Sequence, residues 1–147
     1  TYLSDESMRH KFGRRLQARD AKSFGFDADF QVESYLRHQG LAFTDRFDAN
    51  AYLYITRAMD YFDLAEPYDG RLAGAFAKAR DVRFTLVSFD TDWLYPTSES
   101  RRVVQALQSV GAAASFVELS APFGHDSFLL DVPALDRLVA GALRNGG

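Results

Sequence analysis

The 147-residue chain contains no cysteine. It can therefore form no disulfide framework, no thiolate metal site and no cysteine nucleophile, and this absence is consistent with a reducing compartment. The sequence also has no excess of positive charge, because its formal net charge is −3 at pH 7 and no basic stripe runs through it. The charge pattern argues against nucleic acid as the main partner.

Two kinds of hydrophobic segment are missing as well. No apolar run approaches the roughly 20 residues that a membrane-spanning helix needs, and the first residues lack the pattern of a secretory signal. We therefore expect no membrane partner and a cytoplasmic location. Residue 1 is Thr rather than Met, so we expect the sequence to start inside a longer or a processed protein.

The composition that remains is that of a folded protein. Hydrophobic residues make up 47% of the chain and aromatic residues 14%, which is enough for a core and argues against intrinsic disorder. The pattern changes along the chain, because residues 1–65 are helical and aromatic in character, whereas residues 66–147 alternate helices with strands. We predict a domain boundary near residue 66.

In the first region the pattern predicts helices over residues 2–17, 31–39 and 48–63. Ser4 is expected to cap the first helix, and Gly40 is expected to end the second. The third helix carries two neighbouring apolar stripes. A helix with so much apolar surface must be covered on more than one side, as it would be in a lid or a subunit contact.

The second region reads as alternating helices and strands. After a small helix over residues 71–79, short and nearly continuous apolar runs predict buried strands over residues 82–89 and 113–119. A helix capped by Thr97 or Ser98 separates them, and Pro133 opens the last helix. Two parallel strands cannot close a core, so this region has the character of the end of a larger α/β sheet.

Candidate catalytic side chains follow both predicted strands. Asp90 and Asp92 come directly after the first strand, and His125 follows the second with Gly124 beside it. An acid followed by a His is the order of the last two triad members in α/β-hydrolases. The residues alone leave Asp90 and Asp92 as equal candidates. The sequence contains no G-x-S-x-G motif, so we expect the nucleophilic serine to lie outside this chain.

Three segments carry a resemblance to a known family: RFDANAYLYITRAMDYFD (Arg46–Asp63), FDTDWLYPTSESRRVV (Phe89–Val104) and GHDSFLLD (Gly124–Asp131). They resemble the homoserine O-acetyltransferases, acyl-CoA-dependent enzymes of methionine biosynthesis. The resemblance covers nearly the whole chain but only the C-terminal part of such an enzyme. It implies an α/β-hydrolase fold, with a helical lid region at residues 1–65 and the C-terminal part of the core at residues 66–147.

The resemblance also implies an activity and partners. The expected reaction moves an acetyl group from acetyl-CoA, as a co-substrate, to the hydroxyl of L-homoserine through an acyl-serine intermediate. No metal and no permanently bound cofactor are implied. The expected partners are the missing N-terminal portion that carries the nucleophile and a second copy of the enzyme, in a homodimer that forms through the lid.

For the catalytic pair, the resemblance favours Asp92, the Asp immediately before Trp93, as the carboxylate that orients His125. His125 is then the expected general base. Asp126 resembles the position that holds the amino group of the substrate, with a helix cap for residues 127–130 as the structural alternative.

Leu94 is the expected determinant of the acyl group. The resemblance implies that some close relatives use succinyl-CoA and carry Arg two residues after the catalytic Asp, where it could pair with the second carboxylate of a succinyl group. Leu94 offers no such donor and suits a methyl group, which predicts a preference for acetyl-CoA. The alternative is that Leu94 only packs within its loop.

Other functions remain open at this point. One is acetylation of a different alcohol, such as serine, and another is succinyl transfer to homoserine. A third belongs to a different class: the chain could be a non-catalytic lid and dimerisation module built on its aromatic helices.

Overall fold

The computed structural model describes residues 2–18 and 21–144. The chain divides into two compact units, one formed by Met8–Asp63 and the other by residues 2–7 together with residues 64–144. The chain thus leaves the second unit after Ser7 and returns to it at Leu64. The assignment of these parts to a lid and a catalytic core stays a prediction.

Helix α1 (Asp5–Lys11) begins after the predicted cap residue Ser4 rather than at residue 2, and it ends early. The Ser7 N–H donates to the Ser4 hydroxyl at 3.0 Å, so Ser4 caps the helix. The prediction that the helix continues to residue 17 is wrong, because Gly13 takes a φ of +55° just past its end. Glycine adopts this left-handed conformation without the steric cost that side chains meet, and it commonly ends helices in this way.

Helix α2 (Gln31–Arg46) runs through Gly40, so the prediction that this glycine ends the helix is wrong. Its start is fixed by Glu33, whose carboxylate accepts from the Phe30 N–H at 2.8 Å. A glycine inside a helix costs only about 1 kcal/mol relative to alanine, which a well-capped helix of this length tolerates.

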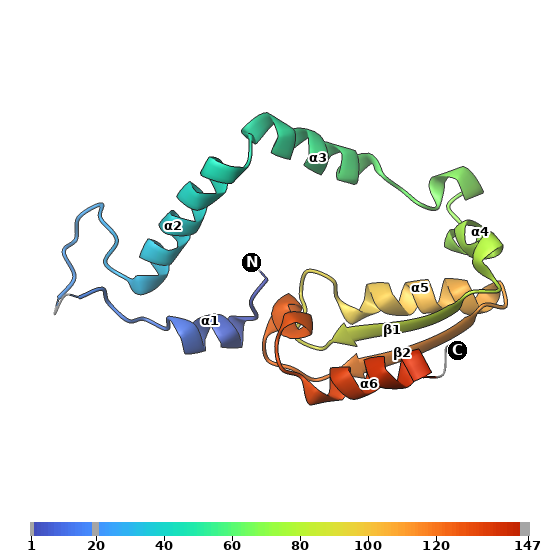
Figure 1. Ribbon diagram of the computed structural model, residues 1–147. Helices are drawn as coiled ribbons and strands as arrows, with labels where there is room; N and C mark the ends of the chain where they lie inside the picture. Colours follow the sequence, from blue (N-terminus) through green and yellow to red (C-terminus); the bar gives the residue numbers. More distant parts are fainter. Residues whose placement is uncertain (1, 19–20, 145–147) are drawn as a thin grey trace. The chain divides into compact units, whose positions relative to one another are not determined.

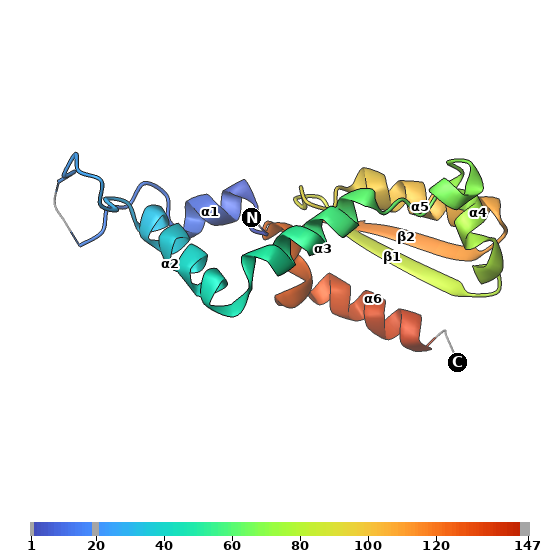
Figure 2. The ribbon, with the colours of Figure 1, turned by 90° about the horizontal axis from the view of Figure 1, so that it is seen from above.

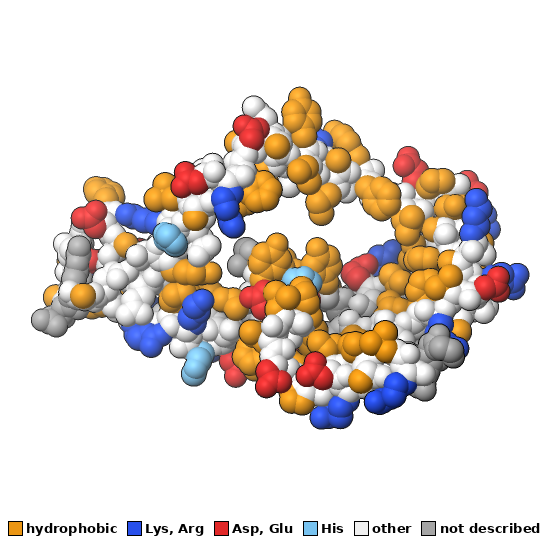
Figure 3. Space-filling model, viewed as in Figure 1, with side chains coloured by type: hydrophobic (Ala, Val, Ile, Leu, Met, Phe, Trp, Pro, Cys, Tyr) orange, Lys and Arg blue, Asp and Glu red, His pale blue; other side chains and the backbone are white. Residues whose placement is uncertain are grey.

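Helix α3 (Ala49–Tyr61) starts at Asp48, whose carboxylate accepts from the Ala51 N–H at 2.9 Å. No residue of α3 is buried within the chain. Figure 3 shows the hydrophobic side chains that gather along this helix. The large apolar side chains exposed on it are Tyr52, Leu53, Tyr54, Ile55, Met59 and Tyr61.

The second unit holds the strands (Figures 1 and 2). Its elements in order are the 3₁₀ helix η1 (Glu66–Tyr68), α4 (Leu72–Phe76), η2 (Ala77–Ala79), β1 (Arg83–Phe89), α5 (Thr97–Ser109), β2 (Ala113–Leu119), η3 (Gly124–Leu129) and α6 (Pro133–Arg144). The predicted cap of α5 is wrong. Its N-cap residue is Pro96, and the Thr97 hydroxyl instead lies 2.8 Å from the Ser88 hydroxyl.

Strands β1 and β2 pair in parallel, with Arg83 opposite Ala113 and Phe89 opposite Leu119. Alternate residues of β1 point to opposite faces of this pair. Phe89 is buried in a cluster that includes Leu135 of α6, whereas Ser88 points toward Thr97 at the start of α5. Because the strands are parallel and equal in length, the segments that follow β1 and β2 leave the sheet at the same edge.

Helices long and apolar enough to span a bilayer are absent from the described part of the chain.

Candidate active site

Asp92 and His125 meet at the carboxyl ends of the two strands. Asp92 lies in the loop after β1, and His125 is the second residue of η3, after β2. The distance from His125 Nδ1 to Asp92 Oδ2 is 2.7 Å. The Asp92 residue is buried at 7% exposure, whereas the His125 side chain is 25% exposed. The pair therefore has a shielded carboxylate and an imidazole that reaches the surface of the described chain.

The backbone of its own loop fixes the Asp92 carboxylate. Oδ1 accepts hydrogen bonds from the N–H groups of Leu94 and Tyr95, each at 3.0 Å. Oδ2 is left for His125. A carboxylate held in this way fixes the orientation of the imidazole, which is the arrangement that a general-base histidine requires.

Asp90, the competing acid, makes different contacts. Its Oδ1 accepts from the Ala121 N–H at 3.2 Å, and the residue is exposed. A hydrogen bond with the Ser120 side chain, together with weaker backbone hydrogen bonds, lowers the pKa of Asp90 below its ordinary value of 3.8. The structure therefore brings Asp92, and not Asp90, to His125.

The turn before His125 is packed tightly against residues 2–4. Gly124 has a φ of +67°, and a Cβ added there would lie 2.6 Å from Tyr2 O and from Ser4 N. The His125 N–H donates to Tyr2 O at 2.9 Å, and the Ser4 hydroxyl donates to the Pro122 carbonyl. Only glycine fits here, and the backbone of residues 2–4 holds the turn in place.

Aromatic rings surround the His125 imidazole. The ring centroids of Tyr95, Phe128 and Tyr2 lie 4.7, 5.2 and 5.6 Å from its own. No described side chain or backbone group hydrogen-bonds to Nε2, so this nitrogen is the atom that can exchange a proton with a reacting group.

Most of the residues that support the histidine are not indicated by the sequence pattern. Tyr2 was given no role, and Ser4 was expected only as a cap. Thr91, between the two candidate acids, was not singled out, yet its hydroxyl bonds to both Ala121 and Gly124. Only the position of Thr91 in the sequence could have indicated its role.

Asp126 and Leu94 both lie next to the pair. Asp126 is the third residue of η3 and is half-buried, so it does not cap this short helix and that alternative is wrong. No described residue donates a hydrogen bond to its carboxylate. Leu94 is half-buried in the loop after β1, where its N–H binds Asp92. Their roles toward a substrate remain proposals.

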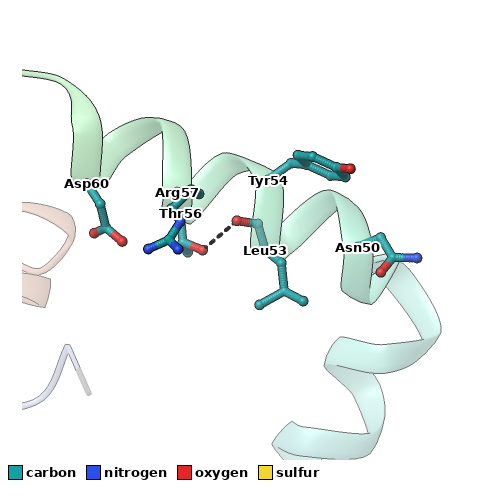
Figure 4. Close-up of a pocket in the computed structure, with 6 residues that line it drawn as sticks. All are labelled: Asn50, Leu53, Tyr54, Thr56, Arg57 and Asp60. Carbon is teal, nitrogen blue, oxygen red and sulfur yellow. Dashed lines mark hydrogen bonds between the residues drawn. The ribbon is translucent and has the colours of Figure 1, made fainter.

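Other described parts of the chain have weaker features of a binding site. A hollow on the helical unit is lined only by α3 residues: Asn50, Leu53, Tyr54, Thr56, Arg57 and Asp60 (Figure 4). A hollow built from one helix does not enclose a ligand. Among residues 2–18 and 21–144 there is no group of three or more His, Asp or Glu side chains placed to hold a metal ion.

The relatives found by comparison with curated proteins and described below share one name. No family model matches the chain. The homoserine O-acetyltransferase of Zymomonas mobilis is 66% identical over 97% of the chain, and that of Caulobacter vibrioides is 62% identical over 97%. That of Rhodopseudomonas palustris is 58% identical over 100%. The chain spans 38%, 37% and 36% of these three proteins, respectively.

A solved structure supports the fold. The crystal structure of a mutant esterase matches 94% of the chain and 37% of its own chain, with a TM-score of 0.72 and 20% sequence identity. At that identity the match concerns the fold alone, and it confirms the predicted α/β-hydrolase class. The predicted resemblance is confirmed as well: over nearly its whole length, the chain is homologous to a C-terminal part of the homoserine O-acetyltransferases.

Proposed function

We propose that this chain supplies the acid and base of an acyltransferase that moves an acetyl group from acetyl-CoA to the hydroxyl of L-homoserine. The observation that carries the proposal is the 2.7 Å contact between Asp92 Oδ2 and His125 Nδ1 at the ends of adjacent parallel strands. The names and high identity of the relatives support the choice of substrates. A serine outside this chain is the proposed nucleophile.

In the first half-reaction, His125 Nε2 accepts the proton of the serine hydroxyl as the serine oxygen attacks the thioester carbon. The bond from that carbon to sulfur then breaks. His125 returns the proton to the departing CoA thiolate, which leaves an acetyl-serine. Asp92 stabilises the imidazolium while it carries the proton, because its carboxylate is already hydrogen-bonded to Nδ1.

In the second half-reaction, the same nitrogen accepts the proton of the homoserine hydroxyl. The homoserine oxygen attacks the acetyl carbon, and the ester bond to the serine breaks. His125 then returns the proton to the serine oxygen, so the enzyme is restored. One base therefore serves both halves, which is consistent with a ping-pong mechanism.

Two neighbouring residues are proposed to select the substrates. Asp126 carries a carboxylate that no described donor engages, so it can pair with the homoserine ammonium. Leu94 offers an apolar side chain, which suits the methyl of an acetyl group. A succinyl group would bring a second carboxylate there, and burying an unpaired charge is costly.

The test uses the full-length protein that contains this chain. With acetyl-CoA alone, the wild type is expected to gain one acetyl group by mass, and adding L-homoserine is expected to release O-acetylhomoserine. His125→Ala is expected to abolish both steps, because neither alcohol can then be deprotonated. His38→Ala is the matched control, since His38 lies on α2 in the other unit.

Other outcomes separate the alternatives. A higher kcat/KM with L-serine, or with succinyl-CoA, would replace the proposed acceptor or donor while leaving the base in place. Full activity of His125→Ala would remove the proposed mechanism. The 147-residue chain on its own is expected to be inactive, because it carries no serine elbow.

The exposed apolar side chains of α3 favour a second role, contact with another copy of the protein through the helical unit. The native mass of the full-length protein tests this role. If Leu53→Glu converts a dimer to a monomer, α3 belongs to the interface. An unchanged mass would exclude the central part of α3 from it.

A further inference from the structure

Three consecutive side chains after β1 each reach the segment after β2. Asp90 Oδ1 accepts from the Ala121 N–H, Thr91 Oγ1 binds Ala121 and Gly124, and Asp92 Oδ2 binds His125. Their partner residues advance along the second segment in the same order as the three residues advance along the first. The two loops are therefore joined by a short ladder of side chains that extends beyond the last pair of the sheet.

Thr91 is the central rung of this ladder. Its hydroxyl donates to the carbonyl of Ala121 and accepts from the N–H of Gly124 at 3.0 Å. One hydroxyl thus uses its donor and an acceptor position on two backbone groups that are three residues apart. Because Gly124 precedes His125 directly, this contact fixes the backbone from which the imidazole extends.

The other contacts of this turn do not replace the hydroxyl. Tyr2 O holds the His125 N–H, and the Ser4 hydroxyl holds the Pro122 carbonyl, so both act from the side of residues 2–4. Thr91 is next to Asp92 in sequence, and its hydroxyl ties the acid's own loop to the Gly124 backbone, directly before the base. A movement of either loop would change the distance between Asp92 and His125.

We propose that Thr91 is a positioning residue, whose hydroxyl holds the turn at Gly124 so that His125 meets Asp92 at hydrogen-bonding distance. The expected effect on kcat rests on the proposed function. The expected effect on the His125–Asp92 contact rests on the geometry alone. Thr91 is not proposed to touch a substrate or the transferred group.

The test compares three variants of the full-length protein. Thr91→Val keeps the shape of the side chain and removes the hydroxyl, whereas Thr91→Ser keeps the hydroxyl. Thr97→Val makes the same chemical change at a threonine whose hydroxyl also joins elements of the sheet, through Ser88 and Glu118, but does not touch the His125 turn.

Three measurements are made on each variant. Steady-state kinetics separate kcat from KM for acetyl-CoA and L-homoserine. Proton NMR follows the low-field resonance of the His125 Nδ1 proton, which reports the hydrogen bond to Asp92 without any substrate. Thermal unfolding checks that each variant is folded.

Thr91→Val is expected to lower kcat by about 10- to 100-fold, the scale of loss when a reacting group is displaced by around 1 Å. Both KM values should stay within about twofold, because no substrate contact is removed. The Nδ1 proton resonance should broaden or move upfield. Thr91→Ser and Thr97→Val should retain the wild-type resonance and keep kcat within about threefold.

Several results would overturn the proposal. A Thr91→Val protein with unchanged kcat and resonance would show that the hydroxyl does not position His125. If Thr91→Ser lowered kcat as much as Thr91→Val, the effect would belong to the methyl group. If Thr97→Val lowered kcat as much, the effect would belong to the sheet as a whole. If neither Thr91→Val nor the smaller Thr91→Ala folds, the hydroxyl serves folding and the proposal fails.

Failure of the proposed function gives a different pattern. A wild type that acylates no alcohol would remove the kinetic part of the argument. The Nδ1 resonance would still distinguish Thr91→Val from Thr91→Ser, so the positioning role is tested in either case.

Discussion

Replacing Asp92 with asparagine changes one atom of the site and removes one charge. In the wild type, Oδ1 accepts from the N–H groups of Leu94 and Tyr95, and Oδ2 faces His125 Nδ1. An asparagine oxygen is the only part of the new side chain that can accept those two backbone hydrogen bonds. The amide NH₂ must therefore face His125.

This orientation reverses the histidine tautomer. An NH₂ group donates, so Nδ1 must present its lone pair and the ring proton must move to Nε2, which can then no longer accept a proton. The opposite amide orientation would leave two backbone donors without an acceptor, at about 1–3 kcal/mol each. We expect kcat to fall by about 10⁴-fold, which corresponds to about 5 kcal/mol of transition-state stabilisation.

The assay is release of free CoA by the full-length protein at saturating acetyl-CoA and L-homoserine, with thermal unfolding as a check on the fold. Asp90→Asn is the matched control. It makes the same substitution two residues away, where the side chain contacts Ala121 and Ser120 and not the histidine. Its kcat is expected to stay within about tenfold of wild type, because the His125–Asp92 contact is untouched.

The reasoning would be refuted if Asp92→Asn kept kcat within tenfold of wild type. Equal damage from Asp90→Asn would also refute it, because the two acids would then share the role. A variant that loses activity only through raised KM values would show that Asp92 acts on binding and not on the base.

Four further predictions concern neighbouring residues. Asp126→Asn is expected to raise the KM for L-homoserine by about tenfold or more with little change in kcat, through loss of a charged hydrogen bond; an unchanged KM would reject the ammonium contact. Leu94→Arg is expected to raise the ratio of kcat/KM for succinyl-CoA to that for acetyl-CoA, and an unmoved ratio would remove position 94 from acyl selection. Gly124→Ala is expected to destabilise the fold in denaturant by about 2 kcal/mol or more, from strain and overpacking. Its control, Gly70→Ala, has a similar φ of +73° but open space around it, so equal losses would show that the close approach to residues 2–4 costs nothing. Finally, because the folded-state pKa of Asp90 is lowered, its ionisation stabilises the fold above the unfolded pKa of about 3.8, and this contribution is lost as the pH falls through the lower folded value. The difference in Tm between wild type and Asp90→Asn should therefore shrink below that pH, and a difference that stays constant with pH would contradict the assignment.

The strands could be predicted from the sequence because their signal is local. The run at residues 113–119 matches β2 at both ends, and the run at residues 82–89 exceeds β1 by one residue. Short apolar segments between turn residues have few other ways to be buried. The proximity of Asp92 and His125 then follows, because residues that come directly after parallel strands in register lie at the same edge of the sheet.

The remaining features depend on contacts that leave no mark in the sequence. Tyr2 holds His125 through its carbonyl, a group that every residue has, so no side-chain pattern predicts the contact. Gly40 and Gly13 are both plausible helix ends, and only Gly13 takes the left-handed conformation. The difference between Asp90 and Asp92 is also spatial, because the backbone donors of the following loop hold Asp92 toward His125, whereas Asp90 contacts Ala121.

The contact between residues 2–4 and the turn before His125 also bears on the order in which the chain folds. The Ser4 hydroxyl and the Pro122 carbonyl are 118 positions apart in sequence, whereas Asp92 and His125 are separated by 33. Contacts between distant residues carry a larger loop-closure cost and form slowly. During synthesis, residues 2–4 emerge long before the Gly124 turn, so their contacts with this turn can form only after it has been made. On the basis of these separations, we expect the acid and base to meet before residues 2–4 lock the turn that carries the base.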